Sequence, residues 1–263
     1  MNVDIVNIAY ICSYFIIYSF MGWVLESIYK TIYAKKIVNS GFLHGPFCPI
    51  YGIGALIMYM LLEEFKEEPI ALFIVSIIIL SILEYIVGVL LEKIFNTKYW
   101  DYSDSKFNIQ GRVCLFNSIV WGGLGVVFTY VIHPFIEKEM NNIPNNILEY
   151  SVTLIMLYIL VDAVVTIFNV KNMDVKLRKL NELSDSLKEK LDELKSLKEN
   201  VELKSIKLQE MQKVIDELKY KQTKIKRKLL RQTNRLRKAF PTMKSDKITE
   251  FLTQKIEIIK KDK

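Results

Sequence analysis

The stretch IALFIVSIIILSILEYIVGVLLEKIF, residues 70–95, decides the fold class of this chain. It exceeds the roughly 20 apolar residues that a helix needs to cross the hydrocarbon core of a bilayer. Its first charged residue is Glu84, fourteen positions after Ile70. The length and composition of this stretch predict a membrane-spanning helix.

Other apolar segments lie on both sides of it. Three reach or approach the same length and a fourth is shorter, namely residues 5–29, 113–134, 147–170 and the short segment 50–62. The short segment would cross a bilayer only with help from the turn before it. We therefore expect an all-α, polytopic membrane helix bundle of about five transmembrane helices with a re-entrant-type turn.

The charge of the chain changes abruptly after this apolar part. Residues 1–170 contain nine Lys and Arg and fourteen Asp and Glu, whereas residues 171–263 contain 27 and fifteen. Such a division indicates two parts with different surroundings. We predict a transmembrane domain over 1–170, a cytoplasmic coiled coil over 171–240 and a short basic amphipathic helix over 241–263.

The links between the apolar segments alternate in basic content. Lys and Arg are frequent after the first and third segments, sparse after the second and fourth, and abundant after the fifth. Because cytoplasmic loops carry the excess of Lys and Arg, this order predicts a multi-pass protein of the bacterial plasma membrane. Its N-terminus lies outside and its C-terminal tail lies in the cytoplasm.

A turn of unusual composition precedes the short segment. Residues 41–52, GFLHGPFCPIYG, carry no formal charge and contain the helix breakers Gly41, Gly45, Pro46, Pro49 and Gly52. Non-helical backbone at membrane depth is tolerated where it is buried in protein or lines a cavity. The turn suits a re-entrant element that enters from the cytoplasmic side; a tight interfacial turn is the alternative.

Three acidic residues interrupt the apolar segments: Glu26, Glu84 and Asp162. Intramembrane acids usually face protein or a water-filled cavity, because exposure to lipid is costly. Their positions along the segments place all three toward the cytoplasmic side, with His44 and Arg112 as candidate partners. We expect one polar cavity formed by these five residues, which serves either a proton or cation site or a structural ion-pair network.

The other cytoplasmic link, KYWDYSDSKFNIQGR (residues 98–112), is rich in aromatic and polar residues. Trp100 suits the membrane interface, and Asp101 and Asn108 supply polar groups. We expect an interfacial loop on the same side as the turn.

The tail contains a heptad pattern. An aliphatic residue recurs every seven positions from Leu180 to Leu236, with Gln222 as the exception, and no Pro or Gly occurs from Lys171 until Pro241. This predicts a long coiled-coil helix, for which self-association and a helical hairpin both remain open. The basic stretch near its end suits an anionic membrane surface or an acidic partner, and nucleic acid is disfavoured because no binding fold accompanies the charge.

Enzyme chemistry is not indicated by the sequence. Cys12, Cys48 and Cys114 are isolated, and the His and carboxylate spacings typical of metal sites are absent. No catalytic motif is present, and no G-x-x-x-x-G-K-[ST] phosphate loop. We expect no catalytic residues, no metal and no cofactor.

Four stretches together resemble a known bacterial family. They are GWVLES (22–27), NSGFLHGPFCPIYGIGA (39–55), LEYIVGVLLEKIF (83–95) and YWDYSDSKFNIQGRVCLFNSIVWG (99–122). Over about residues 8–170 the chain is similar to the ABC-transporter type IV permease family, with Ser40 where an arginine is usual. The resemblance implies a transporter permease whose ATP hydrolysis is supplied by a separate subunit.

These observations leave three function classes. The first is a permease component for a small solute or ion. The second is a non-transporting, membrane-anchored coiled-coil scaffold or regulator, with a homo-oligomer or a partner helix at the tail. The third is a lipid-modifying enzyme, which the absent motifs disfavour.

Overall fold

The fold is known from a computed structural model that describes residues 5–199, 205–246, 248, 249 and 251. About 79% of the chain is helical, which confirms the helical class predicted from the sequence. The described chain forms two compact units. Unit 1 comprises Met1–Ile167 and Arg237–Ser245, and unit 2 comprises Phe168–Leu236 and Asp246–Lys263.

The unit boundaries differ from the predicted domains at the C-terminal end of the chain. Arg237–Ser245, which the sequence places at the end of the tail, belongs to unit 1. We call it the returning segment. The predicted amphipathic helix after it lies largely outside the described residues.

The first half of unit 1 is built from three helices, and the second and third of them begin at a proline. Helix α1 covers Ile5–Ala34, α2 covers Pro49–Leu61, the 3₁₀ turn η1 covers Glu63–Phe65, and α3 covers Pro69–Phe95. Both α2 and α3 begin at a proline, whose fixed φ and missing N–H suit the first helical position. Helix α3 ends at Asn96 in the left-handed conformation.

The second half contains a widened helix. Helix α4 (Leu115–Val127), the π-helical turn η2 (Phe128–Ile132) and α5 (His133–Met140) follow one another without a break. Pro134 has no N–H to donate, so the regular hydrogen-bond ladder is interrupted there, and His133 N–H bonds to Phe128 O instead. Helix α6 (Asn145–Lys171) completes the set.

The only sheet in the part of the chain described is a minimal hairpin. Strands β1 (Asn108–Ile109) and β2 (Val113–Cys114) pair antiparallel, with Asn108 opposite Cys114. Gln110 and Gly111 both have positive φ in the connecting turn. The hairpin ends the interfacial loop and leads directly into α4.

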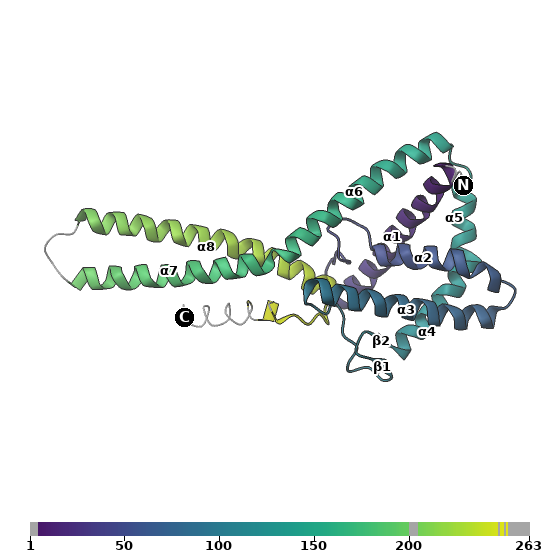
Figure 1. The fold of residues 1–263 in the computed structure, drawn as a ribbon, viewed down its shortest axis with the longest axis horizontal. Coiled ribbons are helices and arrows are strands. Elements are labelled where there is room, and N and C mark those ends of the chain that lie inside the picture. The colour runs from purple at the N-terminus through teal and green to yellow at the C-terminus, as the bar shows by residue number, and fades with distance from the viewer. Residues whose placement is uncertain (1–4, 200–204, 247, 250, 252–263) are drawn as a thin grey trace. The chain divides into compact units, whose positions relative to one another are not determined.

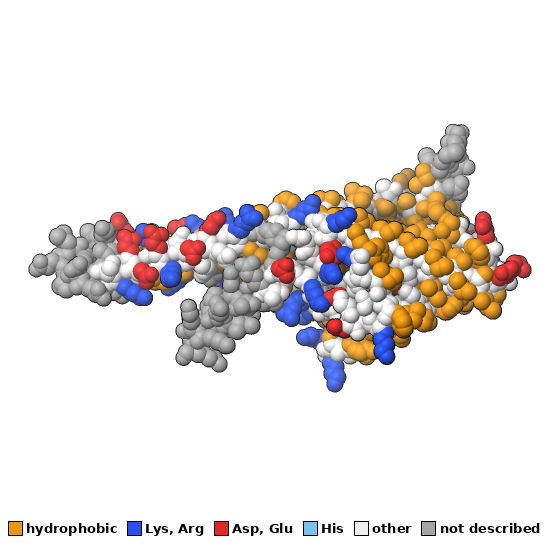
Figure 2. Space-filling model, turned by 60° about the horizontal axis from the view of Figure 1, so that its bottom comes forward, with side chains coloured by type: hydrophobic (Ala, Val, Ile, Leu, Met, Phe, Trp, Pro, Cys, Tyr) orange, Lys and Arg blue, Asp and Glu red, His pale blue; other side chains and the backbone are white. Residues whose placement is uncertain are grey.

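Unit 1 has an apolar outside as well as an apolar core. Four helical runs are long and apolar enough to cross a membrane, while Pro49–Leu61 is shorter. Five full spans are therefore not confirmed. The outer face of α3 exposes an aliphatic residue at every fourth position: Ile70, Ile74, Ile78, Ile82, Ile86, Leu90 and Ile94. Figure 2 shows hydrophobic side chains covering much of the visible face of this unit, as expected of a surface solvated by lipid.

The links of unit 1 gather at two opposite ends (Figure 1). The turns over residues 35–48 and 96–114 lie at one end, and the turns over 62–68 and 141–144 lie at the other. The first end contains Lys35, Lys36, Lys98, Lys106 and Arg112, and the second contains Glu63, Glu64, Glu67 and Glu68. We call them the basic end and the acidic end. Helix α2 runs from the basic end toward the acidic end, opposite to α1 and α3.

Unit 2 contains two helices that lie side by side, α7 (Met173–Glu199) and α8 (Ser205–Ala239), as Figure 1 shows. One continuous helix would separate Ser184 from Gln222 by about 57 Å at 1.5 Å per residue. Instead, Gln222 Nε2 donates to Ser184 Oγ at 2.8 Å. A single continuous helix is therefore excluded, and of the two arrangements left open for the tail the hairpin is the one formed.

The heptad stripe is partly covered in this hairpin. Leu180, Met211, Ile215 and Leu229 are buried. Burial of one apolar stripe explains why a segment as polar as this one is helical. Coiled-coil packing as such stays a prediction.

Candidate functional site

Asp162 holds the apolar turn in place. Its Oδ1 accepts the His44 N–H at 3.2 Å and its Oδ2 accepts the Gly45 N–H at 2.7 Å. His44 Nδ1 lies 2.6 Å from Thr166 Oγ1 and 3.4 Å from Asp162 Oδ1. Two backbone N–H groups therefore satisfy a buried carboxylate, and the carboxylate satisfies two groups that a non-helical turn would leave unpaired.

Gly45 is required by this contact. A Cβ atom at Gly45 would lie 2.4 Å from Tyr158 Oη and 3.1 Å from Asp162 Oδ2. Only a residue without a side chain allows the backbone to approach α6 so closely. The turn is thus fitted to α6 by its glycine as well as by its hydrogen bonds.

The rest of the turn is tied to α1. Cys48 N–H donates to Ser19 O at 2.9 Å, and a Cβ atom at Gly52 would lie 2.2 Å from Ser19 Oγ. Gly41 has a φ of +92° and sits against Cys48 Sγ, while Pro46 lies between the two anchored halves and Pro49 begins α2. The predicted helix breakers are placed where close packing needs them. That the turn is re-entrant stays a prediction.

Ser40 occupies a position without space for a large charged group. It is completely buried, and its N–H donates to Ser27 Oγ at 3.1 Å. Beside it, Asn39 accepts from Trp23 Nε1 at 2.6 Å and donates to His44 O at 2.9 Å. The departure from arginine at this position therefore suits a packed, uncharged neighbourhood.

Glu26 forms a separate site near the end of α1. Lys30 Nζ donates to Glu26 Oε1 at 2.6 Å, one turn along the helix, and Cys48 Sγ donates to Glu26 Oε2 at 3.5 Å. Lys30 Nζ also donates to the carbonyl of Ala239 and lies 5.0 Å from the centroid of the Phe240 ring. This acid is neutralised by its own helix and linked to the returning segment.

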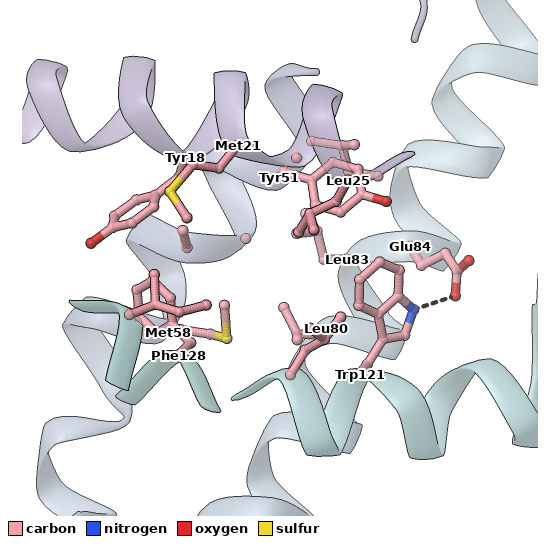
Figure 3. Close-up of a pocket in the computed structure, with 16 residues that line it drawn as sticks. Tyr18, Met21, Leu25, Tyr51, Met58, Leu80, Leu83, Glu84, Trp121 and Phe128 are labelled. Carbon is pink, nitrogen blue, oxygen red and sulfur yellow. Dashed lines mark hydrogen bonds between the residues drawn. The ribbon is translucent and has the colours of Figure 1, made fainter. Parts of the chain in front are cut away.

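Glu84 has a third environment. Trp121 Nε1 donates to its Oε2 at 3.1 Å, and Tyr102 Oη donates to its Oε1 at 3.3 Å. Glu84 is 6% exposed, and Figure 3 shows its carboxylate meeting the indole of Trp121 at one side of a cavity. Each carboxylate oxygen thus has one donor, from a different element.

The cavity beside Glu84 is almost wholly apolar. It has a volume of about 100 Å³. Its wall comes from α1, α2, α3, α4 and η2, and it is lined by Tyr18, Met21, Gly22, Leu25, Ile50, Tyr51, Gly54, Ala55, Met58, Leu80, Leu83, Glu84, Trp121, Leu124, Phe128 and Ile132. Ligand pockets for drug-sized molecules typically measure 300–1,000 Å³, so this one suits a compact molecule. Glu84 is the one formally charged residue of the lining.

Arg112 lies outside this cavity, at the interfacial loop. Its guanidinium donates to Glu92 Oε2 and to Gln110 Oε1, both at 2.5 Å, and lies 5.7 Å from the Tyr85 ring centroid. Trp100 Nε1 donates to Arg112 O at 2.8 Å. Arg112 therefore fastens the loop to α3.

The remaining polar residues of the loop shape its backbone. Asn108 donates to Ser103 O and Ser105 O and accepts from the Gly111 N–H. Asp101 accepts from both the N–H and the hydroxyl of Ser103. Burial, and after it the Glu84 carboxylate, raises the pKa of Tyr102 above its usual value, so this phenol stays protonated as a donor to Glu84.

The returning segment packs on this same loop. Phe240 packs edge-on against Tyr99 at 4.9 Å, Lys244 exchanges backbone hydrogen bonds with Lys98, and the Lys244 ammonium pairs with the Asp101 carboxylate. Thr97 Oγ1 donates to Ser245 Oγ at 3.1 Å. The heptad pattern ends at Leu236, before this segment, and Pro241 marks the end of the helix in the sequence.

The five predicted cavity residues are thus distributed over separate places. The structure brings His44 and Asp162 together, whereas Glu26, Glu84 and Arg112 each have different partners. The described residues contain no group of three or more His, Cys, Asp or Glu able to hold a metal ion. Of the five, Glu84 alone lines the cavity. Tyr102 and Trp121, its donors, were missed because they come from distant segments.

Comparison with known proteins gives one match. A family model described as "Putative ABC-transporter type IV" matches residues 13–167. No curated protein and no solved structure matches the chain. The match ends at the residue where the main part of unit 1 ends, so both α7 and α8 lie outside it. Because the match covers more than half of the chain, the protein belongs to the ABC-transporter type IV family.

Proposed function

We propose that the chain is the membrane-embedded component of a transporter, and that the cavity beside Glu84 binds a small organic cation in transit. The observation that carries the proposal is an apolar cavity inside a membrane bundle with one charged residue on its wall. Intramembrane acids are costly, and such residues commonly mark ion or substrate pathways.

The chemistry of the wall supports a cation. Tyr18, Tyr51, Trp121 and Phe128 present aromatic rings around the cavity, and Glu84 supplies a carboxylate. Aromatic faces attract organic cations that have shed water, and an ionised carboxylate balances their charge. The volume of about 100 Å³ limits the ligand to a compact molecule.

The proposed orientation places the basic end of unit 1 in the cytoplasm and the N-terminus outside. The concentration of lysines at the turns 35–48 and 96–114 supports it. Helix α2 with the apolar turn would supply the fifth crossing, since it runs opposite to its neighbours. ATP hydrolysis would come from a separate subunit, because the sequence of this chain contains no phosphate-binding loop.

The test is a transport assay with a cavity-filling variant. The purified chain, with any ATPase subunit that accompanies it, is reconstituted in liposomes, and ATP-dependent movement of radiolabelled tetramethylammonium and tetraethylammonium is measured. Gly54→Val should abolish movement because Gly54 lines the cavity, against Leu80 and Leu83. The matched control is Gly123→Val, whose Cβ would meet nothing within 4 Å.

A second variant separates charge from volume. Glu84→Gln keeps the shape and removes the charge, so it should impair transport of the cations while the protein remains folded. Wild-type protein that transports neither probe, with its ATPase present, would remove support for a cation pathway. Equal loss in Gly54→Val and Gly123→Val would indicate damage to folding and not to the cavity.

The alternative is a membrane-anchored scaffold or regulator in which the hairpin is the working part. The observation that favours it is the returning segment, which joins the hairpin to the interfacial loop through Phe240 and Lys244. Removal of residues 171–263 discriminates between the two functions. Transport by the truncated chain supports the permease, and a cellular phenotype equal to that of the complete gene deletion supports the scaffold.

A further inference from the structure

The two helices of unit 2 bring its basic residues to one end of the hairpin. Gln222 bonds to Ser184, and Gln232 Nε2 donates to Asn169 O at 2.7 Å. This register places residues 219–236 alongside residues 169–188, the part of the chain that leaves α6. We call this part of the hairpin its base and residues 189–218 its tip.

The base and the tip differ sharply in charge. Residues 219–236 contain eight Lys and Arg and no Asp or Glu, and residues 169–188 contain five basic and three acidic residues. Residues 189–218 contain six basic and eight acidic residues. The net positive charge of the hairpin therefore lies in its base.

Four cations of the base share one exposed helix face. Lys224, Arg227, Lys228 and Arg231 follow the spacing i, i+3, i+4 and i+7, and all four are exposed. In the described part of α8, Lys221 forms an ion pair with Glu217. None of the four cations forms an ion pair with a described residue. We call these four residues the basic face.

The fold also brings like charges together at this place. Lys228 of α8 and Lys176 of α7 lie near enough to repel each other. Exposed like charges at such spacings are destabilising unless counter-charge is supplied. Within the part of α8 and α7 that the structure describes, no acidic side chain forms an ion pair with the basic face, so an external anion would stabilise the folded hairpin.

Chain connectivity keeps the base close to the membrane. Asn169 and Lys171 close the lipid-exposed helix α6, and six residues after Arg231 the chain enters the returning segment, which belongs to unit 1. At 1.5 Å per residue, Arg231 is about 9 Å and Lys224 about 20 Å along the helix from Arg237. The base is thus joined to unit 1 by two chain connections, one before Phe168 and one after Leu236.

We propose that the basic face binds the anionic phospholipid headgroups of the leaflet at the basic end of unit 1. The partner is a lipid surface because both attachments of the base lead to the membrane and because no nucleic-acid-binding fold accompanies the charge. Each Lys or Arg near an anionic leaflet strengthens association about fivefold. This inference does not depend on transport by the cavity.

The experiment uses the full chain in nanodiscs of phosphatidylcholine with 0, 15 or 30% phosphatidylglycerol. Hydrogen exchange of peptides from residues 219–236 is followed by mass spectrometry, with and without 0.5 M NaCl. Exchange should slow several-fold as the anionic lipid fraction rises, and salt should reverse the effect by screening. Peptides from residues 205–214, in the tip, should not respond.

Two triple variants with equal loss of charge identify the surface. Lys224→Gln/Arg227→Gln/Arg231→Gln should lose the lipid response, whereas Lys190→Gln/Lys195→Gln/Lys213→Gln, in the tip, should keep it. Circular dichroism of both variants checks that the helices persist. A basic-face variant that unfolds is replaced by the three single substitutions, each of which should weaken the response.

Other arms of the experiment separate alternative anions. Protection by 10 mM inorganic phosphate in pure phosphatidylcholine discs would indicate a phosphate site and overturn the lipid assignment. Protection that requires added RNA or an acidic polypeptide would overturn it as well. Wild-type exchange that is independent of phosphatidylglycerol, or a basic-face variant that responds as the wild type does, would contradict the proposal.

Discussion

Unit 1 and unit 2 differ in whether their charged side chains have partners within the protein. In unit 1, Glu26, Glu84 and Asp162 each have their own donors, supplied by Lys30, by Tyr102 and Trp121, and by the backbone of the apolar turn. In unit 2, cations lie exposed in rows along the helices. A lipid environment requires each charge to be satisfied by the protein, while water or headgroups can satisfy charges that the fold leaves unpaired. The following predictions test this contrast, from the largest expected effect to the smallest.

Removing the carboxylate of Asp162 should have the largest effect on stability. Asp162→Ala removes the acceptor of the buried Gly45 N–H, at about 1–3 kcal/mol, together with the acceptor of the part-buried His44 N–H. We expect a loss of about 2–4 kcal/mol in the free energy of unfolding, measured by thermal unfolding in detergent. Asp185→Ala, on the exposed face of α7, should change stability little. Equal losses of stability in Asp162→Ala and Asp185→Ala would contradict this difference between the units.

Adding a single methyl group at the turn should come next. Gly45→Ala places a Cβ atom 2.4 Å from Tyr158 Oη, and we expect a cost of about 1–3 kcal/mol from overpacking. Tyr158→Phe in the same chain should recover part of it by removing the hydroxyl. Gly123→Ala, which meets nothing within 4 Å, should stabilise its helix instead by about 0.5–1 kcal/mol. Unfolding temperatures of the four proteins measure this, and the absence of any recovery in the double variant would contradict the clash.

Removing one donor from Glu84 should have a smaller effect. Tyr102→Phe deletes the hydroxyl that bonds to Glu84 Oε1, and Trp121 still serves Oε2. We expect a loss of about 1 kcal/mol, since a typical intramolecular hydrogen bond contributes about that much. Tyr29→Phe on an exposed part of α1 is the control. If both variants have the same free energy of unfolding, the hydrogen bond from Tyr102 to Glu84 does not contribute to stability.

The docking of the returning segment should depend on pH only at the extremes. Burial raises the pKa of Asp101, but hydrogen bonds from Lys244 and Ser103 outweigh it and lower this pKa from 3.8 to about 2. A lowered folded-state pKa means that the contribution is complete above the unfolded value and is lost as the pH falls through about 2. The pairing with Asp101 raises the pKa of Lys244 above 10.5, so its contribution persists until the pH exceeds that value. Hydrogen exchange of residues 240–245, corrected for intrinsic rates, should be constant from pH 5 to 9 and faster at pH 3.

A substitution provides the matching test at neutral pH. Asp101→Asn removes the charge that faces Lys244, and we expect trypsin to cut after Lys244 several-fold faster than in the wild type. Asp104→Asn, three residues along the same loop, should leave the cleavage rate nearly unchanged. This effect is the smallest of the series because Lys244 is 65% exposed and water screens the pair.

The sequence predicts the elements of unit 1 more reliably than their side-chain partners. Apolar length locates the four long helices, and prolines mark the starts of α2 and α3. His44 was expected to face all three acids, and the structure pairs it with Asp162. The structure does not bring the five residues together. Glu26 pairs with Lys30, which lies one turn along the same helix, and the rotation of α3, which hydrophobic length does not specify, directs Glu84 toward Trp121.

The tail illustrates a different limit. A heptad pattern indicates that an apolar stripe packs against another helix. It does not specify whether that helix comes from another chain or from the same chain folded back. No Gly or Pro marks the change of direction between α7 and α8. The contact of Phe240 with Tyr99 was equally hidden, since it joins positions 141 residues apart.

The returning segment gives the hairpin two mechanical attachments. One is the continuous backbone from α6, and the other runs through Phe240 and Lys244 to the loop that carries Tyr102. A force applied at the tip of the hairpin would therefore be divided between a membrane helix and the donor of Glu84. A protease cut at the tip would therefore leave each half of the hairpin covalently joined to unit 1.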